Sequence, residues 1–471
     1  MSPSELRHIK SRTGCQPCKR RHLKCDERKP TCGRCRKRGE TCTGNFKSAI
    51  WHIENPSLYM LRPVLPPATI GSPQSSSTSL RSLGTLNYAP VNDIIQHWFD
   101  HACLTMAIVP PPMNPLSYPI SPYLQRSQAV RHAVECVSQA HRNHFSAAQV
   151  AKVLEERSLA LVSLQHEIGK ASPSASPFRL RAILLASLLL GISSGWVTAD
   201  EYGVEFLVGA RRVVQSILGE PVDESAEDTC LNYLLGLYLY WEAVCSFLDT
   251  DLYGVSPSTI SIPHLLEMVA SRYLNREVHP VTGIATSLFP IITEIGNLYR
   301  RTVNFPYIDP CEETRIEAKL REWSPPGPPS DSLNARWRYF QSLSQSYHAM
   351  GVIMLHQARS VVRDLTEQEM SALTDAVGIV MVTLKVCPLA DPLLNSIAPL
   401  LVIAGSELRN NQTELRALVS QRAREITKYT RITAYTGALE LVRDIWRQRD
   451  NGSGITWLEL MFQQRKILLL V

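Results

Sequence analysis

The feature that most constrains this chain is the spacing of six cysteines near its N-terminus. They follow the pattern C-x2-C-x6-C twice, with six residues between the copies, at Cys15, Cys18, Cys25, Cys32, Cys35 and Cys42. Such a group can form disulfides, remain as free thiols or bind metal. The N-terminal residues are charged and lack an apolar stretch, so we expect no secretory signal and an intracellular protein with reduced thiols. Free thiols at this density would oxidise readily, which leaves thiolate-bound metal, with zinc as the first choice.

Counting ligands limits the number of metal ions. One tetrahedral zinc takes four ligands and would leave two cysteines unused, whereas two zincs need eight ligand positions from six sulfurs. The count closes only when two cysteines each bridge both metals. Because the spacing repeats, the bridges occupy equivalent places in the two copies, but the spacing leaves three pairs open. So short a segment, with few apolar side chains, cannot build a core, so zinc binding must supply its folding free energy.

The positive charge of the chain is concentrated in the same region. Residues 1–47 contain 14 Lys or Arg and four Asp or Glu, a net charge of +10, whereas the remaining residues have a net charge of −4. A small cationic segment on a mildly acidic body indicates binding to a polyanion. A basic cluster can also act as a nuclear-import signal. Phe46 is the only aromatic side chain among residues 1–50, so the segment lacks the stacking surface typical of RNA binding, and we favour double-stranded DNA.

The two halves of the cysteine pattern differ in the residues that follow them. The first is followed by the basic, helix-compatible run KRRHLK, and the second by RKRGET, which a glycine interrupts and a glutamate makes acidic. We therefore expect the first run to enter the major groove as a short, metal-braced helix. Arginine or lysine at its tip would donate to the O6 and N7 acceptors of guanine.

The stretch GCQPCKRRHLKCDERKPTCGRCRKRGETC resembles the binuclear zinc cluster of fungal transcription factors, and all five intervals between the six cysteines agree. In that family the first and fourth cysteines bridge the metals. The resemblance therefore implies two Zn²⁺ per chain, with Cys15 and Cys32 as bridges. One ion would be bound by Cys15, Cys18, Cys25 and Cys32. The other would be bound by Cys32, Cys35, Cys42 and Cys15.

The same resemblance implies how DNA is read. Family members read CGG-type triplets with the third and fourth residues after the second cysteine, which here are Arg21 and His22. The fourth is often lysine in the family, so His22 departs from the commonest pattern at one base-reading position. The other basic residues are interpreted as phosphate contacts, which position the module without selecting a sequence: Arg12, Lys19, Arg20 and Lys24.

A linker follows the cysteine region. From Pro63 to Ser82, 13 of 20 residues are Pro, Ser, Thr or Gly, a composition typical of an extended linker. We find no heptad repeat between Thr43 and Asn92, and the prolines of this stretch exclude a long helix. Many members of the zinc-cluster family dimerise through a coiled coil at this place. A homodimer of this chain must therefore form through the rest of the chain, and a monomeric DNA-binding unit remains an alternative.

Residues 93–471 are predicted to be helical throughout. Apolar residues recur at i, i+3, i+4 and i+7 from Val130 and again from Ala210, and residues 230–247 are apolar on nearly every side, as in a central buried helix. Thr366 and Glu369 form a capping-box pattern. The longest apolar run, residues 182–191, is shorter than a membrane span requires, so we expect no membrane association.

This helical body also resembles the regulatory domain that follows the zinc cluster in many fungal regulators. The resemblance is carried by AVRHAVECVSQAH and by the stretch from LLASLLLGISSGW through YGVEFLVGARRVVQSIL. It implies a domain for effector response, control of activation or self-association. We therefore expect a flexible basic N-terminus at 1–14, a binuclear zinc cluster at 15–42, a Pro/Ser-rich linker at 43–92 and an all-α regulatory domain at 93–471.

Other patterns in the body suggest different chemistry. Gly191-x-Ser193-x-Gly195 fits the nucleophile elbow of hydrolases, but no strand pattern surrounds it, so we interpret it as a helix end and turn. The pairs His97-x3-His101 and His141-x2-His144 have metal-ligand spacing but no third ligand, and are interpreted as ordinary histidines. The six scattered cysteines are predicted to be buried apolar residues: Cys103, Cys136, Cys230, Cys245, Cys311 and Cys387.

Together these features predict a nuclear, sequence-specific transcription factor of RNA polymerase II genes that is not an enzyme. We expect it to recognise CGG-type elements, to contact transcriptional co-regulators and, by analogy with the family, to control a metabolic or secondary-metabolite gene cluster. A zinc-stabilised module that binds acidic protein partners is the alternative. An esterase acting through Ser193 is a weaker one. A mobility shift with CGG-containing DNA separates the first two.

Overall fold

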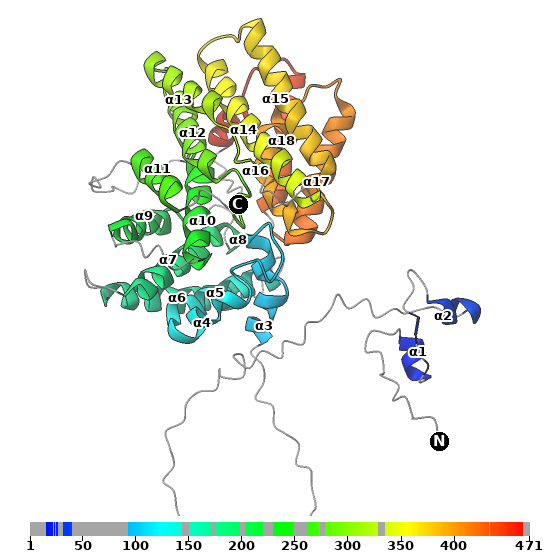
Figure 1. Ribbon diagram of the computed structural model, residues 1–471. Helices are drawn as coiled ribbons and strands as arrows, with labels where there is room; N and C mark the ends of the chain where they lie inside the picture. The colour runs from blue at the N-terminus through cyan, green and yellow to red at the C-terminus, as the bar shows by residue number, and fades with distance from the viewer. Residues whose placement is uncertain are drawn as a thin grey trace, which may run out of the picture. The chain divides into compact units, whose positions relative to one another are not determined.

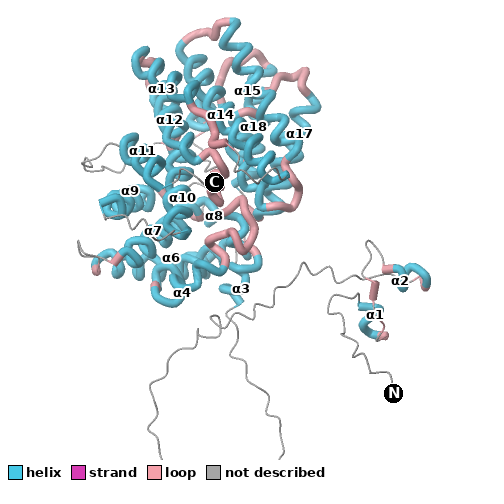
Figure 2. The backbone as a smooth tube through the Cα atoms, viewed as in Figure 1, coloured by secondary structure: helices cyan, strands magenta, loops and turns pink. Residues whose placement is uncertain are grey.

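The computed structural model describes residues 16–21, 23, 25–26, 32–39, 93–143, 150–170, 176–197, 203–219, 229–248, 262–273, 278–327, 335–432 and 434–464. The chain divides into two units, residues 1–72 and 73–471. Regular structure in the described residues is helical, apart from one isolated antiparallel bridge between His279 and Gly283 (Figures 1 and 2). A small cysteine module followed by a large all-α domain was the predicted fold class, and it is confirmed for this part of the chain.

The described residues of the first unit form two short helices, α1 (Gln16–Arg20) and α2 (Gly33–Lys37). The first half of the second unit contains α3 (Asp93–Asp100), α4 (Ser121–Arg126), α5 (Gln128–Arg142), α6 (Val150–Gly169), α7 (Pro177–Ile192), α8 (Ser194–Val197), α9 (Val204–Gly219), α10 (Thr229–Cys245) and α11 (Ile262–Tyr273). The second half contains α12 (Phe289–Asn304), α13 (Pro310–Glu322), α14 (Ala335–Val362), α15 (Glu367–Val386), α16 (Ala398–Ile403), α17 (Thr413–Thr430), α18 (Ala434–Asp450) and α19 (Trp457–Gln463). Short 3₁₀ helices lie at Ala102–Met106, Tyr118–Ile120, Thr286–Leu288, Pro392–Ser396 and Gly405–Glu407.

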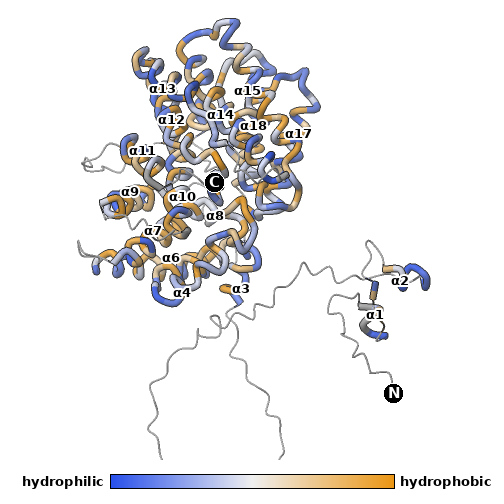
Figure 3. Tube along the Cα trace, in the orientation of Figure 1, coloured by the Kyte–Doolittle hydropathy of each residue, from blue (hydrophilic) through white to orange (hydrophobic). Residues whose placement is uncertain are grey.

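Helix α10 lies at the centre of the second unit. It packs against α7, α9, α11 and α12. From residue 230 to residue 248 only Cys230 and Asn232 are half-buried, and every other side chain is buried. The prediction of a central helix over residues 230–247 is therefore confirmed. Elsewhere in the unit, apolar and polar residues alternate along the helices, as expected where one side of each helix faces the core (Figure 3).

Helices α5 and α6 form a closely packed pair at one end of the second unit. The predicted apolar side of α5, which begins at Val130, is fully buried. The Ser127 hydroxyl caps α5 by accepting a hydrogen bond from the Val130 amide at 3.1 Å, and it donates to the Glu167 carboxylate of α6 at 2.8 Å. Ser127 therefore caps the N-terminus of α5 and holds Glu167, near the C-terminal end of α6, against that terminus.

The second half of the unit is organised around the long helix α14, which packs against α12, α15 and α16. The predicted capping box at the start of α15 is present, since Thr366 and Glu369 exchange both hydrogen bonds. Helix α19 returns to the core, where the Trp457 ring meets the edge of Phe247 at a centroid distance of 5.1 Å. The Trp457 indole also donates to the Gln357 side chain at 3.0 Å. These contacts join the end of the described chain to α10 and α14.

One described stretch, Pro177–Trp196, is long and apolar enough to cross a membrane by length and composition. Of its most apolar window, 83% is buried among the other helices of the unit. The stretch comprises α7 and α8. Its hydropathy is therefore that of a core helix in this fold.

The prediction for the scattered cysteines is partly wrong. Cys103, Cys136, Cys245 and Cys387 are buried, but Cys230 is half-buried and Cys311 is exposed. Cys311 lies in the first turn of α13, where its amide donates to the capping carboxylate of Asp309 at 3.0 Å. The side of α13 that faces the core is formed instead by Ile316 and Leu320.

Candidate metal centre and nucleic-acid interface

Each described helix of the first unit begins directly after the first cysteine of a C-x2-C pair. Pro17 occupies the first turn of α1, where its missing N–H has no helical partner to lose. Helix α2 is capped by Cys32, whose Sγ accepts a hydrogen bond from the Cys35 amide at 3.3 Å. A thiolate in this position takes the part that serine or aspartate plays at other helix starts. The C-x2-C spacing therefore places one cysteine at the cap of α2 and the next one inside the helix.

The buried side chains of the described part of this unit are those of Pro17 and four cysteines. Cys18, Cys25, Cys32 and Cys35 are 3%, 6%, 1% and 2% exposed and form a cluster of their own. Leu23, an apolar neighbour, is only half-buried. Burial of thiols alone provides little hydrophobic free energy, so the unit requires a further source of stability.

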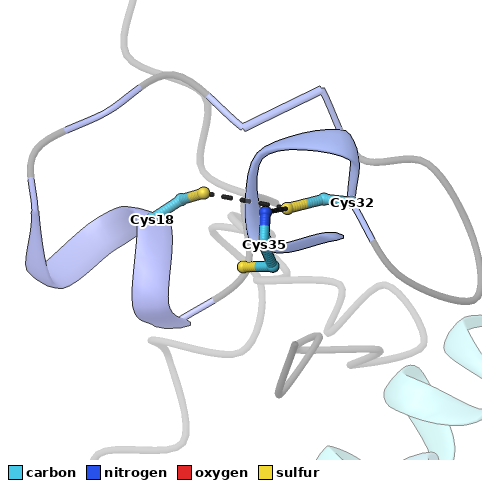
Figure 4. Close-up of side chains that lie close together, drawn as sticks. All are labelled: Cys18, Cys32 and Cys35. Carbon is cyan, nitrogen blue, oxygen red and sulfur yellow. Dashed lines mark hydrogen bonds between the residues drawn. The ribbon is translucent and has the colours of Figure 1, made fainter. Parts of the chain in front are cut away.

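The positions of the sulfurs fit a metal ion. Cys18, Cys32 and Cys35 point toward one another from α1 and α2, and their Sγ atoms all lie within 4.8 Å of each other (Figure 4). The Cys18 and Cys32 sulfurs are 3.8 Å apart. Two thiolates bound to one tetrahedral zinc at about 2.3 Å each are separated by about 3.8 Å. The geometry of this pair therefore matches joint coordination of zinc.

Cys32 occupies a special place in this arrangement. It belongs to the group with Cys18 and Cys35, and also to a second group of potential ligands with Cys25 and Asp26. Its sulfur is therefore near ligands from both halves of the repeat. Cys15 and Cys42 lie outside the described residues.

Asp26 has a structural role that the sequence did not reveal. Both of its carboxylate oxygens accept a hydrogen bond from the Gly33 amide at 3.0 Å. This amide is at the start of α2, where a carboxylate is stabilised by the unpaired N–H groups of the helix end. A Cβ atom on Gly33 would lie 2.6 Å from Asp26 Oδ2. Glycine at this position thus allows Asp26 to tie the loop between the halves to α2.

The predicted reading run is helical only at its beginning. Helix α1 ends at Arg20, Arg21 lies in the following turn, and Leu23 is outside any helix. The amide of Leu23 bonds back to the Cys18 carbonyl at 3.0 Å, which turns the chain out of the helix toward Cys25. Arg20 and Arg21 are both exposed at the C-terminal tip of α1. Lys19 lies within α1, and Arg12, His22 and Lys24 are outside the described residues.

A second exposed basic surface lies on α2. It is formed by Arg34, Arg36, Lys37 and Arg38. The helix ends at Lys37, and Gly39 has a φ of +65°, so the predicted interruption by this glycine is confirmed. These four residues contribute to the net charge of +10 in residues 1–47, but the sequence pattern assigned them no specific role. Their exposure beside the cysteine cluster adds to the positive field of the unit.

Comparison with known protein families identifies both units. Residues 13–49 match the family described as the fungal Zn(2)-Cys(6) binuclear cluster domain. Residues 93–471 match the family described as the fungal specific transcription factor domain. The chain belongs to the fungal-specific transcription factor family. Its members are DNA-binding regulators of transcription and not enzymes, and the cluster domain implies that the chain binds zinc.

Individual relatives support this assignment over short stretches. The chain is 35% identical over 120 residues to sterol uptake control protein 2 of Candida albicans, which is 23% of this chain and 15% of the relative. It is 52% identical over 40 residues to a Zn(2)-C6 fungal-type transcription factor of Gibberella zeae, 8% of each chain. It is 54% identical over 37 residues to the transcription factor afumD of Aspergillus fumigatus, 8% of this chain and 10% of the relative. The matches thus span only a small part of each relative. No solved structure matches the chain.

The hydrolase-like pattern of the body is a helix end, as the sequence predicted. Ser193 is fully buried at the C-terminal cap of α7, where its hydroxyl faces the Leu190 carbonyl at 3.5 Å. A Cβ on Gly191 would lie 2.1 Å from the Trp241 ring of α10. Close packing of α7 on α10 therefore accounts for the glycine. The described residues around it contain no strand, so the pattern lacks the strand-to-helix turn of an elbow.

One histidine of each pair meets the other in the structure. His97 Nε2 and His141 Nδ1 are 3.0 Å apart and join α3 to α5, whereas His101 is exposed and His144 is outside the described residues. Burial, followed by the charge of His101 and of the arginines Arg142 and Arg431, lowers the pKa of His97 to about 4. A neutral pair of rings can share one hydrogen, and the nearby arginines disfavour a metal cation. The interpretation as structural histidines is therefore retained.

Proposed function

We propose that this chain is a nuclear, sequence-specific regulator of RNA polymerase II genes that reads CGG-type elements through a two-zinc cluster. The observation that carries the proposal is the convergence of the cysteine sulfurs, with one pair at the separation expected for joint zinc coordination. One zinc is held by Cys15, Cys18, Cys25 and Cys32. The other is held by Cys32, Cys35, Cys42 and Cys15. The place of Cys32 in both described ligand groups supports its role as a bridge.

Zinc supplies structural free energy here rather than chemistry at a substrate. The unit has no apolar core among its described residues beyond the cysteines, so the bound metals fix α1 and α2 relative to one another. Fixing α1 presents Arg21 and His22 to the major groove. The exposure of Arg21 beyond the last turn of α1 supports this role. Arg12, Lys19, Arg20 and Lys24 contact phosphates and set the register of the module on DNA.

The domain organisation follows from these roles. A basic N-terminus (1–14) and the zinc cluster (15–42) bind DNA, the linker (43–92) separates them from the body, and the helical body (93–471) regulates transcription and contacts co-regulators. Sterol uptake control protein 2 of Candida albicans is named for control of sterol uptake. That relative supports regulation of a metabolic or biosynthetic gene cluster by this chain.

The experiment that tests the proposal compares two adjacent exposed arginines. In mobility shifts of the full chain, Arg21→Ala should weaken binding to a CGG-containing duplex by about 1–3 kcal/mol, with little effect on a scrambled duplex. Arg20→Ala is the matched control. It should weaken binding to both duplexes equally, and reduce the slope of log affinity against log salt by about 0.9, as expected for one lost phosphate contact.

Two results would contradict the proposal. If the wild-type chain binds both duplexes equally, or binds neither, the sequence-reading role is wrong. A chain that binds no DNA but captures acidic proteins would support the alternative of a zinc-stabilised interaction module. Removal of zinc with a chelator should abolish binding to both duplexes, because the reading turn loses its support.

A further inference from the structure

Helix α15 presents a regular apolar seam to solvent. Six exposed positions follow intervals of four and three residues in alternation: Gln368, Ala372, Asp375, Ile379, Val382 and Val386. Three of them carry large apolar side chains, with Ile379 44%, Val382 60% and Val386 55% exposed, and Leu389, which is 58% exposed, follows in the turn after the helix. Alternating intervals of four and three are the spacing at which one helix meets another in a coiled coil.

The seam is separate from the side of α15 that holds the helix in the body. The inward side carries Ala376, Val377, Val380, Met381 and Leu384, which are buried against neighbouring helices, α14 among them. The seam residues therefore belong to a second apolar surface. A single exposed valine needs no explanation, but three large apolar side chains at one periodicity on one helix indicate a contact surface.

Helix α6 provides a useful comparison. It also exposes five apolar side chains, at Val150, Leu154, Leu159, Val162 and Ile168. Their intervals of four, five, three and six residues distribute them around the helix rather than along one side. Exposed apolar residues thus occur elsewhere in the body, but the regular seam is a property of α15.

We propose that α15 is the interface between two copies of this chain, packed antiparallel about a twofold axis near residues 380 and 381. In this arrangement Ile379 of one copy meets Val382 of the other. This pairing occurs twice, as a twofold interface requires. The small residues Ala372 and Gly378 let the helices approach, and a Cβ on Gly378 would meet nothing within 4 Å in the isolated chain.

The charges of α15 identify a second copy as the partner. Asp375 and Lys385 are exposed and nearly equidistant from the proposed axis. Neither side chain forms an ion pair with the part of its own chain that the structure describes. Antiparallel packing brings Asp375 of each copy near Lys385 of the other, whereas parallel packing would place like charges together. The helix is therefore complementary to itself in one orientation only.

The α15 interface takes the place of a coiled coil in the linker, since residues 43–92 contain no heptad repeat. A dimer formed through α15 carries two zinc clusters and can engage two half-sites. That consequence rests on the proposed function, but the interface itself does not. Assembly is therefore tested without DNA, so that its failure is distinguishable from failure of DNA reading.

Analytical ultracentrifugation of the full chain tests the interface. The wild-type chain should be a dimer at tens of micromolar. Val382→Asp should raise the dimer dissociation constant by at least about tenfold, because it buries a charge beside Ile379 of the other copy. The matched control is Val162→Asp on α6, an equally exposed valine that should leave the dimer unchanged. A monomeric wild type, or equal effects of the two substitutions, would overturn the proposal.

Exchange of the charges at Asp375 and Lys385 tests the antiparallel orientation of the two helices. This test does not depend on the apolar seam. Asp375→Lys and Lys385→Asp should each weaken the dimer, since each places like charges together. The double variant should recover most of the wild-type affinity, because the pairs are restored with their signs reversed. A double variant no tighter than either single variant would contradict antiparallel self-packing. Circular dichroism confirms that each variant retains its helices.

Discussion

At the scale of single residues, Cys32 is the proposed bridge of the zinc cluster. Cys32→Ala in the full chain should lose both metals, because the substitution removes a ligand shared by two ions. Cys18→Ala should retain more zinc, since it removes a ligand from one ion only. The measurement is the zinc content per chain by elemental analysis. Equal loss in the two variants would argue that Cys32 does not bridge.

His279 couples the stability of the body to pH. Its ring is buried, its Nδ1 accepts a hydrogen bond from the Val281 amide at 3.1 Å, and its Nε2 lies 3.2 Å from the Asn232 carbonyl. Burial lowers its pKa from 6.5 to about 4. Because the unfolded chain takes up a proton near pH 6.5 and the folded chain does not, stability is complete above 6.5 and is lost as pH falls toward 4.

Through this one group, the free energy of unfolding should change by up to about 1.4 kcal/mol per pH unit. It can be measured by denaturant unfolding of the wild type and of His279→Gln at a series of pH values. The variant has lower stability at neutral pH, but its dependence on pH between 6.5 and 4 should be shallower. Identical slopes in the two proteins would contradict the assignment. His97 shifts in the same direction and contributes to the slope in both.

At the scale of helices, the packing of α10 depends on how closely neighbouring segments approach its backbone. A Cβ on Gly236 would lie 2.2 Å from His279 Nε2, so no side chain fits between α10 and the turn that carries this histidine. Gly236→Ala should therefore destabilise the body by about 1–3 kcal/mol in denaturant unfolding. Gly209→Ala on α9, where a Cβ meets nothing within 4 Å, should instead stabilise it by up to about 1 kcal/mol. Destabilisation of similar size in both variants would show that loss of glycine, rather than the contact, is responsible.

The helices also show what the sequence can predict and why it fails elsewhere. The buried side of α5 and the capping box of α15 follow from local spacing, so both were predicted. The early end of α1 was not, because it depends on a bond from the Leu23 amide to the Cys18 carbonyl. Exposure of Cys311 depends on which side of α13 faces the core, and the hydrogen bond from Gly33 to Asp26 depends on the loop between the cysteine halves. These features are set by tertiary contacts that composition and periodicity do not encode.

At the scale of the whole molecule, two units have different sources of stability. The body is stabilised by a large apolar core, whereas the described part of the first unit buries only four cysteines and Pro17. The ligand count, the charge distribution and the family could all be inferred from the sequence, because they depend on residue types and intervals. The self-complementary seam of α15 required the structure, since the sequence does not distinguish the side of α15 that faces the body from the side that faces solvent.

The most direct test of the account is the number of zinc ions bound by one chain. Six cysteine sulfurs, two of which bridge both metals, should hold two zinc ions. Native mass spectrometry of the full-length chain can count these ions. The account predicts two zincs per chain, released together as chelator is added. A single zinc in the wild-type chain would contradict the bridged cluster on which the presentation of Arg21 to DNA depends.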